Sequence, residues 1–184
     1  MMRNENAQLY TIEGIASAML LIVVVIFVVR AAPMTPNTSS SAHQYLEAQL
    51  ETQGQDLLTI LDYVPDGSLN SPLKQAIIDW TGVQFEGQSP VRPQSVNYTA
   101  NVLNEALADA GIVYNLELSV DTPSGIATYG VLWNGKPSDN AVTVSRKVVL
   151  HDDDAVVATD KIQDMDPTTE FYNIVDVRLT LWRM

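Results

Sequence analysis

The sequence contains no cysteine. This absence excludes disulfide bonds, thiolate zinc sites, iron–sulfur clusters and thiol nucleophiles. Core packing alone must therefore hold any folded domain of this chain together. When the apolar N-terminal segment is set aside, about 150 residues remain, which suits one domain with one hydrophobic core.

Basic residues are also scarce. The chain has 10 Lys and Arg against 22 Asp and Glu, which gives a formal net charge of −12. Such a surface repels phosphate backbones, so nucleic acid is not an expected partner. The acidic balance favours solubility, and it would also suit a high-salt habitat.

Recognisable catalytic patterns are absent as well. The chain has two histidines, His43 and His151, which are far apart and share no motif. The sequence has no GxSxG, P-loop, HExxH or GxGxxG pattern. We therefore predict a protein that is not an enzyme and that has no cofactor.

What the chain does have is a long apolar run near its N-terminus. Ile15–Val29 reads IASAMLLIVVVIFVV, and as a helix it would cover roughly 22 Å. Extending the helix back to Leu9 gives about 31 Å, the thickness of a bilayer core, but includes the carboxylate of Glu13. We predict a transmembrane helix over residues 8–30, with the lipid bilayer as a partner.

Three interpretations of this segment compete. A cleaved secretory signal peptide is one, although Glu5 offsets Arg3, and Arg30 and Pro33 stand where the cleavage site belongs. A plain signal anchor is the second. The third depends on Glu13 and the residues just before it.

The stretch Ala7–Gly14 reads AQLYTIEG and leads directly into the apolar run. It resembles the N-terminus of archaeal type IV pilin-like proteins, which carry a class III signal peptide. More narrowly, the acidic C-terminal part is similar to pilin-like membrane proteins of haloarchaea. The resemblance implies a leader of residues 1–7, removed by a prepilin peptidase between Ala7 and Gln8.

The resemblance also gives Glu13 a role in assembly. In a pilin filament the N-terminal helices form an apolar bundle, and a lone carboxylate there pairs with the N-terminal amine of a neighbouring subunit. Because an unpaired charge in such a bundle is costly, the pair sets the axial register. The alternative is that Glu13 only marks the membrane edge. The expected partners are other copies of the chain or other pilin-like subunits.

Residues 31–42 are rich in proline, serine and threonine and carry no charge. They are predicted to form a linker before an extracytoplasmic domain of residues 43–184. Asn37 and Asn97 each begin an N-glycosylation sequon, so both are glycosylation candidates if the domain lies outside the cell. Two sequons in a chain of this length are close to the number expected by chance.

Helices are predicted in the first half of the domain. Leucines spaced by four and seven residues predict a helix over 43–62, which Gly54 should weaken in its middle. Ser71 and Pro72 suit the N-cap and first turn of a second helix. The predicted helices cover 43–62, 72–81 and 99–110, with a loop over 82–95 and Gly111 ending the last helix.

After Gly111 the apolar pattern changes to a period of two, which predicts strands over residues 112–120, 127–133, 141–150 and 171–182. Helices followed by strands indicate an α+β fold. We predict helices packed on an antiparallel sheet, in the order of a pilin-like head.

One cluster suggests a metal site. His151, Asp152, Asp153 and Asp154 offer four successive nitrogen or oxygen donors that could bind a hard cation such as Ca²⁺. Consecutive residues at a strand end point in alternate directions, however, and the EF-hand spacing is absent. The alternative is an acidic turn that leaves a strand.

Taken together, these patterns predict a single-pass protein of the cell membrane with an extracellular C-terminal domain. The leading hypothesis for its function is a pilin-like structural subunit, or a pseudopilin, of a cell-surface filament or assembly system. The alternative hypothesis is a membrane-anchored extracellular binding or accessory domain that does not polymerise.

Overall fold

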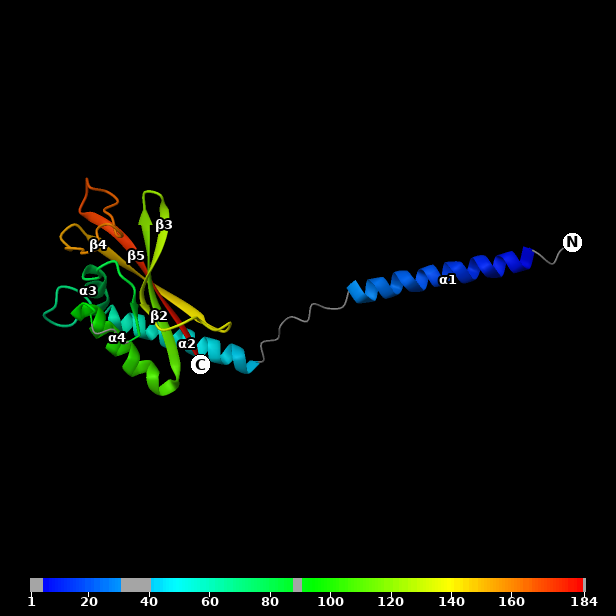
Figure 1. Cartoon of the computed structure of the whole chain (residues 1–184), viewed down its shortest axis with the longest axis horizontal. Coiled ribbons are helices and arrows are strands. Elements are labelled where there is room, and N and C mark those ends of the chain that lie inside the picture. The colour runs from blue at the N-terminus through cyan, green and yellow to red at the C-terminus, as the bar shows by residue number, and fades with distance from the viewer. Residues whose placement is uncertain (1–4, 31–40, 88–90, 184) are drawn as a thin grey trace. The chain divides into compact units, whose positions relative to one another are not determined.

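The computed structural model describes residues 5–30, 41–87 and 91–183. The chain divides into two units, Met1–Ser41 and Ala42–Met184 (Figure 1). The predicted linker over 31–42 lies outside the described residues, apart from Ser41 and Ala42, which are the first residues of a helix.

The first unit contains one helix, α1 (Glu5–Arg30). Its side chains are described from Glu13 to Ile26. Alanine, leucine and methionine favour the helix, and proline is absent from it.

The structure corrects the prediction of a membrane span. Among the described residues, no helix is both long enough and apolar enough to cross a membrane. The predicted transmembrane helix over residues 8–30 is therefore wrong, and so is the predicted single-pass membrane location with an extracellular domain.

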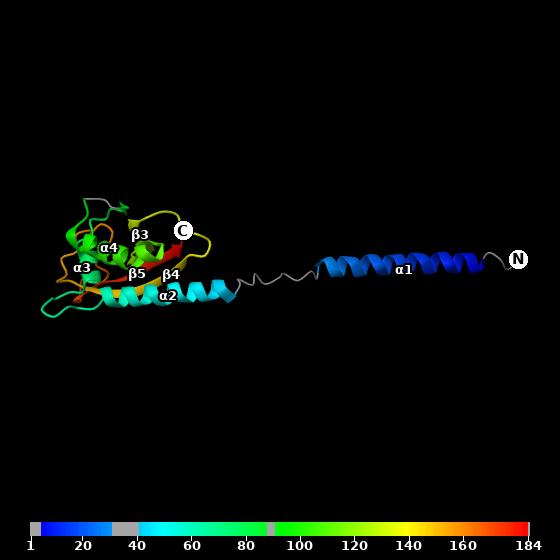
Figure 2. The same ribbon diagram turned by 90° about the horizontal axis from the view of Figure 1, so that it is seen from below.

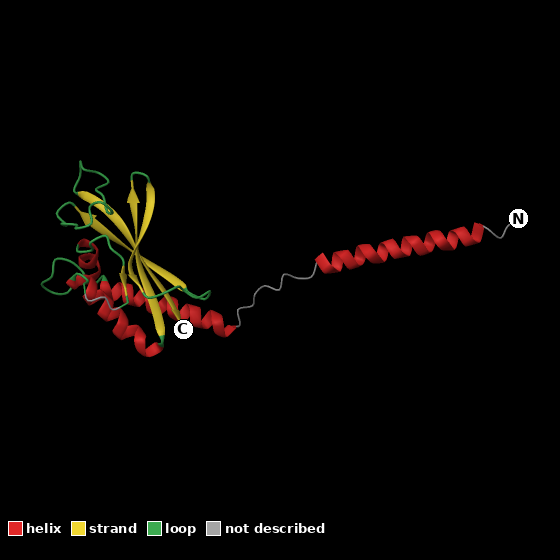
Figure 3. Ribbon diagram, in the orientation of Figure 1, coloured by secondary structure: helices red, strands yellow, loops and turns green. Residues whose placement is uncertain are grey.

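The second unit is built on a five-stranded sheet with the order β1-β3-β2-β5-β4. Figure 3 shows these strands as one twisted layer with helices beside it. The pairs β2–β3, β2–β5 and β4–β5 are antiparallel. The strands are β1 (Phe85–Glu86), β2 (Ile112–Thr122), β3 (Gly125–Trp133), β4 (Val142–His151) and β5 (Phe171–Arg183).

The four predicted strands are all present, within a few residues of the expected ends. The sheet, however, is mixed rather than antiparallel, because β1 pairs with β3 in parallel. This strand falls in the predicted loop over 82–95. Its two residues are too few to show an alternating pattern, and Phe85 joins the sheet by burying its ring beside Leu132.

Three helices pack on one face of the sheet, with a 3-10 turn after the third (Figure 1). The predicted α2 (Ser41–Leu61) is confirmed, as is the cap of α3 (Pro72–Ile78), where the backbone N–H of Lys74 donates to Ser71 Oγ over 3.1 Å. The third helix begins earlier than predicted. The remaining elements are α4 (Gln94–Leu107) and η1 (Ala108–Ala110).

Gly54 has a role that helix propensity does not reveal. A Cβ atom at this position would lie 2.7 Å from Val144 Cγ2 and 2.8 Å from Leu181 Cδ1. The missing side chain therefore allows α2 to approach β4 and β5 closely (Figure 2). Gly54 costs the helix some propensity, but it also sets the distance between helix and sheet.

The core lies between these helices and the inner face of the sheet. The alternating apolar residues of β5, from Val175 to Leu181, are fully buried there. The leucines of α2 cover the same face, and Trp80 is fully buried after α3. The largest fully buried side chains are Trp80, Leu58, Leu61, Leu73, Ile77, Leu103, Leu107, Leu118, Leu132, Leu150, Ile162 and Leu179.

Two connections complete the domain. Residues 134–141 cross the sheet from β3 to β4, and Asn134 and Gly135 bond to Asn115 on the way. This crossing explains why Asn115, a polar residue on the outer side of β2, is buried. Residues 152–170 fold back onto the core, where Ile162 is buried and the N–H of Val157 donates to the carbonyl of Ile78.

Candidate functional site

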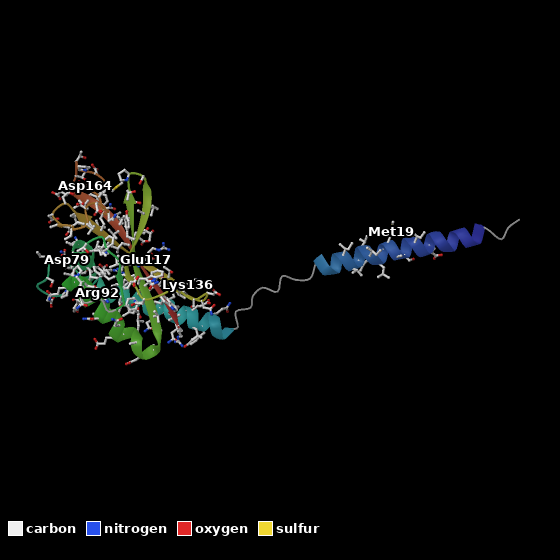
Figure 4. The ribbon with its side chains drawn as sticks, in the orientation of Figure 1. Met19, Asp79, Arg92, Glu117, Lys136 and Asp164 are labelled. Carbon is white, nitrogen blue, oxygen red and sulfur yellow. The ribbon has the colours of Figure 1, made fainter. Side chains whose placement is uncertain are left out.

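The most unusual surface of the molecule is on α1. From Met19 to Ile26 every side chain is a large apolar one, and each is about half exposed or more. Eight successive residues make more than two helical turns, so the apolar surface surrounds the helix. Figure 4 shows the side chains, Met19 among them, projecting on several sides. A helix that is apolar all round is normally buried, so this surface is a candidate for contacts with other molecules.

The residues predicted to control assembly lie on this helix. The exposed Glu13 precedes Gly14 and the apolar stretch directly. The backbone of Ala7 and Gln8, the predicted processing site, belongs to α1. Their side chains are outside the described part of the chain. The predicted role of Glu13 in setting register and the predicted cleavage therefore stay predictions.

The glycosylation candidates differ in what the structure shows. Asn97 is exposed on α4, followed by the exposed Tyr98 and the buried Thr99. Asn37 lies outside the described residues. The structure thus places one sequon on the surface of a helix, and its modification stays a prediction.

The acidic cluster predicted as a metal site lines an open pocket of about 650 Å³. The pocket lies between the loop before α3 and the end of β4. Its lining combines the predicted His151, Asp152, Asp153 and Asp154 with four residues distant in sequence, Leu69, Asn70, Lys74 and Glu170.

Within this pocket the carboxylates do not converge on one point. Asp154 Oδ2 lies 2.6 Å from Lys74 Nζ and accepts the backbone N–H of His151 over 2.8 Å. Lys74 thus takes the place at Asp154 that a cation would need. Among the described residues, no group of three histidine or acidic side chains is arranged to hold a metal ion.

The carboxylates nevertheless influence one another. The pKa of Asp152 is raised, first by loss of hydration and then by the nearby carboxylates of Asp164, Asp153 and Glu170. The pKa of Tyr172 is raised by burial and by Asp164 and Asp152. This end of the domain therefore carries a concentrated negative potential.

A second pocket was not foreseen from the sequence. It has about 590 Å³ and lies among the α2–α3 loop, α3 and the first turns of α4. The sequence predicts a helix from Pro72, but not that α4 packs beside it. Gln75 and Asp79, four residues apart on one helix face, are the only signal in the sequence of a polar wall.

Comparison with known proteins places the chain in a family. The family model with the description "Family of unknown function (DUF7288)" matches residues 6–181. This chain belongs to that family. The matched region includes most of α1 together with the second unit, Ala42–Met184, which is called the α/β domain from here on. The family is therefore defined by both units of the chain.

One relative is an uncharacterized protein of Archaeoglobus fulgidus. It is 30% identical over 178 residues, which cover 97% of this chain and 92% of the relative. No solved structure matches the chain. The resemblance to archaeal pilin-like proteins therefore stays a prediction.

Proposed function

We propose that this protein is a pilin-like, non-enzymatic structural subunit that assembles with other copies through α1. The observation that carries this proposal is the exposed apolar surface of α1, from Ile15 to Ile26. Bringing these side chains together would remove them from water, the dominant driving force in protein association.

The size of the surface fits such an assembly. Among the described side chains of α1, nine large apolar ones are exposed, and residues of this size expose on the order of 100 Å² each. Their combined area, on the order of 900 Å², is comparable to the roughly 800 Å² that one partner contributes to a standard protein–protein interface. Because the surface surrounds the helix, α1 has room for more than one neighbour, as the interior of a filament requires. The nine residues are Ile15, Met19, Leu20, Leu21, Ile22, Val23, Val24, Val25 and Ile26.

Glu13 supplies the specificity that an apolar helix lacks. A surface of valine, leucine and isoleucine permits many axial offsets between packed helices. A carboxylate carried into the bundle needs a cation, because leaving a buried charge unpaired is costly. In this proposal the N-terminal amine of a neighbouring subunit, freed by cleavage after Ala7, provides that cation and fixes the register.

Cysteine cross-linking tests the assembly directly, since the chain has no cysteine of its own. Four single variants, Ile22→Cys, Val23→Cys, Val24→Cys and Val25→Cys, sample one turn of α1 in the full chain. With a short bismaleimide, we expect covalent dimers and higher species whose yield varies with helical position. Glu105→Cys, at an exposed position on α4, is the control and should remain monomeric. Monomers at all four α1 positions would refute assembly through α1.

The role of Glu13 needs a separate test. Glu13→Ala and Glu13→Gln should both abolish ordered assemblies seen by electron microscopy, because each removes the charge. Ser17→Ala, at another exposed polar position on α1, should leave them intact. If Glu13→Gln assembles normally, the carboxylate does not set the register, although α1 would still mediate association.

Processing is tested by mass spectrometry of the mature protein. Cleavage by a prepilin peptidase predicts a chain that begins at Gln8. A mature chain that still contains Arg3 contradicts both the cleavage and the pairing of Glu13 with a freed amine.

A binding domain that does not polymerise is a second candidate function. The two adjacent pockets of the α/β domain, which share Leu69 and Asn70, favour it. Cross-linking separates the two candidates, because the binding domain alone predicts a monomer.

A further inference from the structure

The pocket between the α2–α3 loop and α4 has features of a ligand site, independent of assembly through α1. The α2–α3 loop, α3 and α4 each contribute to its wall, and Asp79 marks this end of the domain in Figure 4. The complete lining is Pro65, Ser68, Leu69, Asn70, Pro72, Gln75, Asp79, Gln94, Ser95 and Tyr98.

Three polar side chains in this wall are held in a defined order. Asn70 Nδ2 donates to Gln75 Oε1 over 3.1 Å, and Gln75 Nε2 donates to Asp79 Oδ1 over 3.1 Å. An amide nitrogen carries two hydrogens and a carboxylate has two oxygens. A ligand can therefore donate a hydrogen bond to Asn70 Oδ1, accept one from the second N–H of Gln75 Nε2, and donate one to Asp79 Oδ2.

The loop that carries Asn70 is held in place by hydrogen bonds to Asp62. Asp62, at the end of α2, accepts a hydrogen bond from Arg146 Nε over 2.6 Å and one from Ser71 Oγ over 3.2 Å. Ser71 in turn caps α3. A wall fixed in this way loses little conformational entropy when a ligand binds.

Two further groups lack partners on the α4 side. Ser95 Oγ is buried and, among the described residues, has no hydrogen-bond partner. The first turn of α4, which begins after Pro93, has no side-chain cap. N–H groups at a helix start are normally paired, so a ligand hydroxyl beside Gln94 could accept from this turn, whereas Ser95 Oγ is itself shielded from the pocket.

The rest of the lining mixes apolar and uncharged polar residues. Tyr98 is 55% exposed and Leu69 is 98% exposed, and two prolines add flat aliphatic surface. Among the described residues, no lysine, arginine or histidine lines the pocket, and the only formal charge in its lining is on Asp79. An anionic ligand is therefore disfavoured.

We propose that this pocket binds a neutral saccharide. Alternating acceptors and donors match the vicinal hydroxyls of a pyranose ring, and the tyrosine and leucine side chains match its C–H face. A single row of polar side chains in an open pocket suits one or two sugar units bound weakly, with a Kd on the order of 1 mM, about −4 kcal/mol.

Saturation-transfer difference NMR on the full chain suits weak binding and tolerates large assemblies. The probes are methyl α-D-glucopyranoside, methyl α-D-mannopyranoside, methyl α-D-galactopyranoside and N-acetyl-D-glucosamine, each at millimolar concentration. We expect saturation of ring protons in at least one of the four. Tyr98→Ala should lower the affinity for that sugar roughly five- to tenfold, whereas Tyr98→Trp should retain it.

The matched control is Tyr45→Ala, which removes an exposed tyrosine from α2 and should leave the signal unchanged. Absence of transfer to all four sugars, or equal signals in Tyr98→Ala and the parent chain, would overturn the proposal. A stronger signal from the uncharged tripeptide Ala-Ser-Ala than from any sugar would also overturn it, because the pocket would then recognise peptide groups.

Discussion

Large apolar side chains are buried in one unit of this chain and exposed in the other. In the α/β domain, leucines such as Leu58 and Leu179 are completely buried between helices and sheet. On α1, residues of the same kind, such as Leu21, remain 65% exposed. The domain is therefore stabilised by its own contacts, whereas the apolar surface of α1 is available for contacts with other molecules. In the proposed function, stability therefore belongs to one unit and association to the other.

The largest expected effect that tests this comparison comes from two leucine truncations, one in each unit. Leu58→Ala should lower the free energy of unfolding of the domain by about 2–5 kcal/mol, because it leaves a cavity in the core. Leu21→Ala should leave that free energy unchanged within about 0.5 kcal/mol. Urea unfolding followed by tryptophan fluorescence measures both. An equal loss in both variants would show that α1 also stabilises the domain.

The stability of the α/β domain should also depend on pH, because it buries the phenol of Tyr114. Burial raises the pKa of Tyr114 to about 12, against an ordinary value of 10, and the nearby Arg92 lowers it only in part. The unfolded chain loses this proton first, so the tyrosine's contribution is complete below pH 10 and decreases as the pH rises towards 12. We expect about 2–3 kcal/mol of stability to be lost across this interval.

Tyr114→Phe provides the control. The phenol oxygen lies 3.1 Å from the carbonyl oxygen of Ala100 and 3.1 Å from Asn104 Oδ1, and its single O–H donates to one of them, so its removal should cost about 1 kcal/mol at neutral pH. The loss of stability between pH 10 and pH 12 should then become smaller in this variant. If the slope stays the same as in the parent chain, other groups cause the alkaline unfolding.

The smallest expected effect comes from two helical glycines. Gly54→Ala should destabilise the domain by about 1–2 kcal/mol, because contacts with Val144 and Leu181 exceed the gain in helix propensity. Gly14→Ala has open space around it and should stabilise α1 by about 0.5–1 kcal/mol. Unfolding of the domain and hydrogen exchange of the α1 amides report the two effects separately. A stabilising Gly54→Ala would show that the helix can move away from the sheet without loss.

Much of the secondary structure was predictable, because its signals are local. The leucine spacing of α2, the Ser71-Pro72 start of α3 and the alternation in β2 and β5 each involve only neighbouring residues. Both ends of α4 illustrate the limits of such signals. Gly111, at φ +63°, ends the helical segment as predicted, but α4 starts at Gln94 without a side-chain cap that the sequence would reveal.

The candidate sites were less predictable. The apolar surface and Glu13 of α1 are visible in the sequence because they form one continuous stretch, but the expected membrane span is not supported by the described helix. The acidic cluster at His151–Asp154 was visible too, whereas its pairing with Lys74 was not. That ion pair joins residues 80 positions apart, and only packing of α3 beside the segment that follows β4 brings them together.

By itself the sequence determined the types and approximate limits of most elements, the absence of thiol chemistry, the acidic charge and the apolar character of α1. These are properties of composition and of short periodic patterns. Only the tertiary structure decided the parallel pairing of β1, the close approach of α2 at Gly54, the burial of Asn115 and the pocket formed by Asn70, Gln75, Asp79 and Tyr98. Each of these depends on contacts between segments distant in the chain, and local propensity carries no information about such contacts.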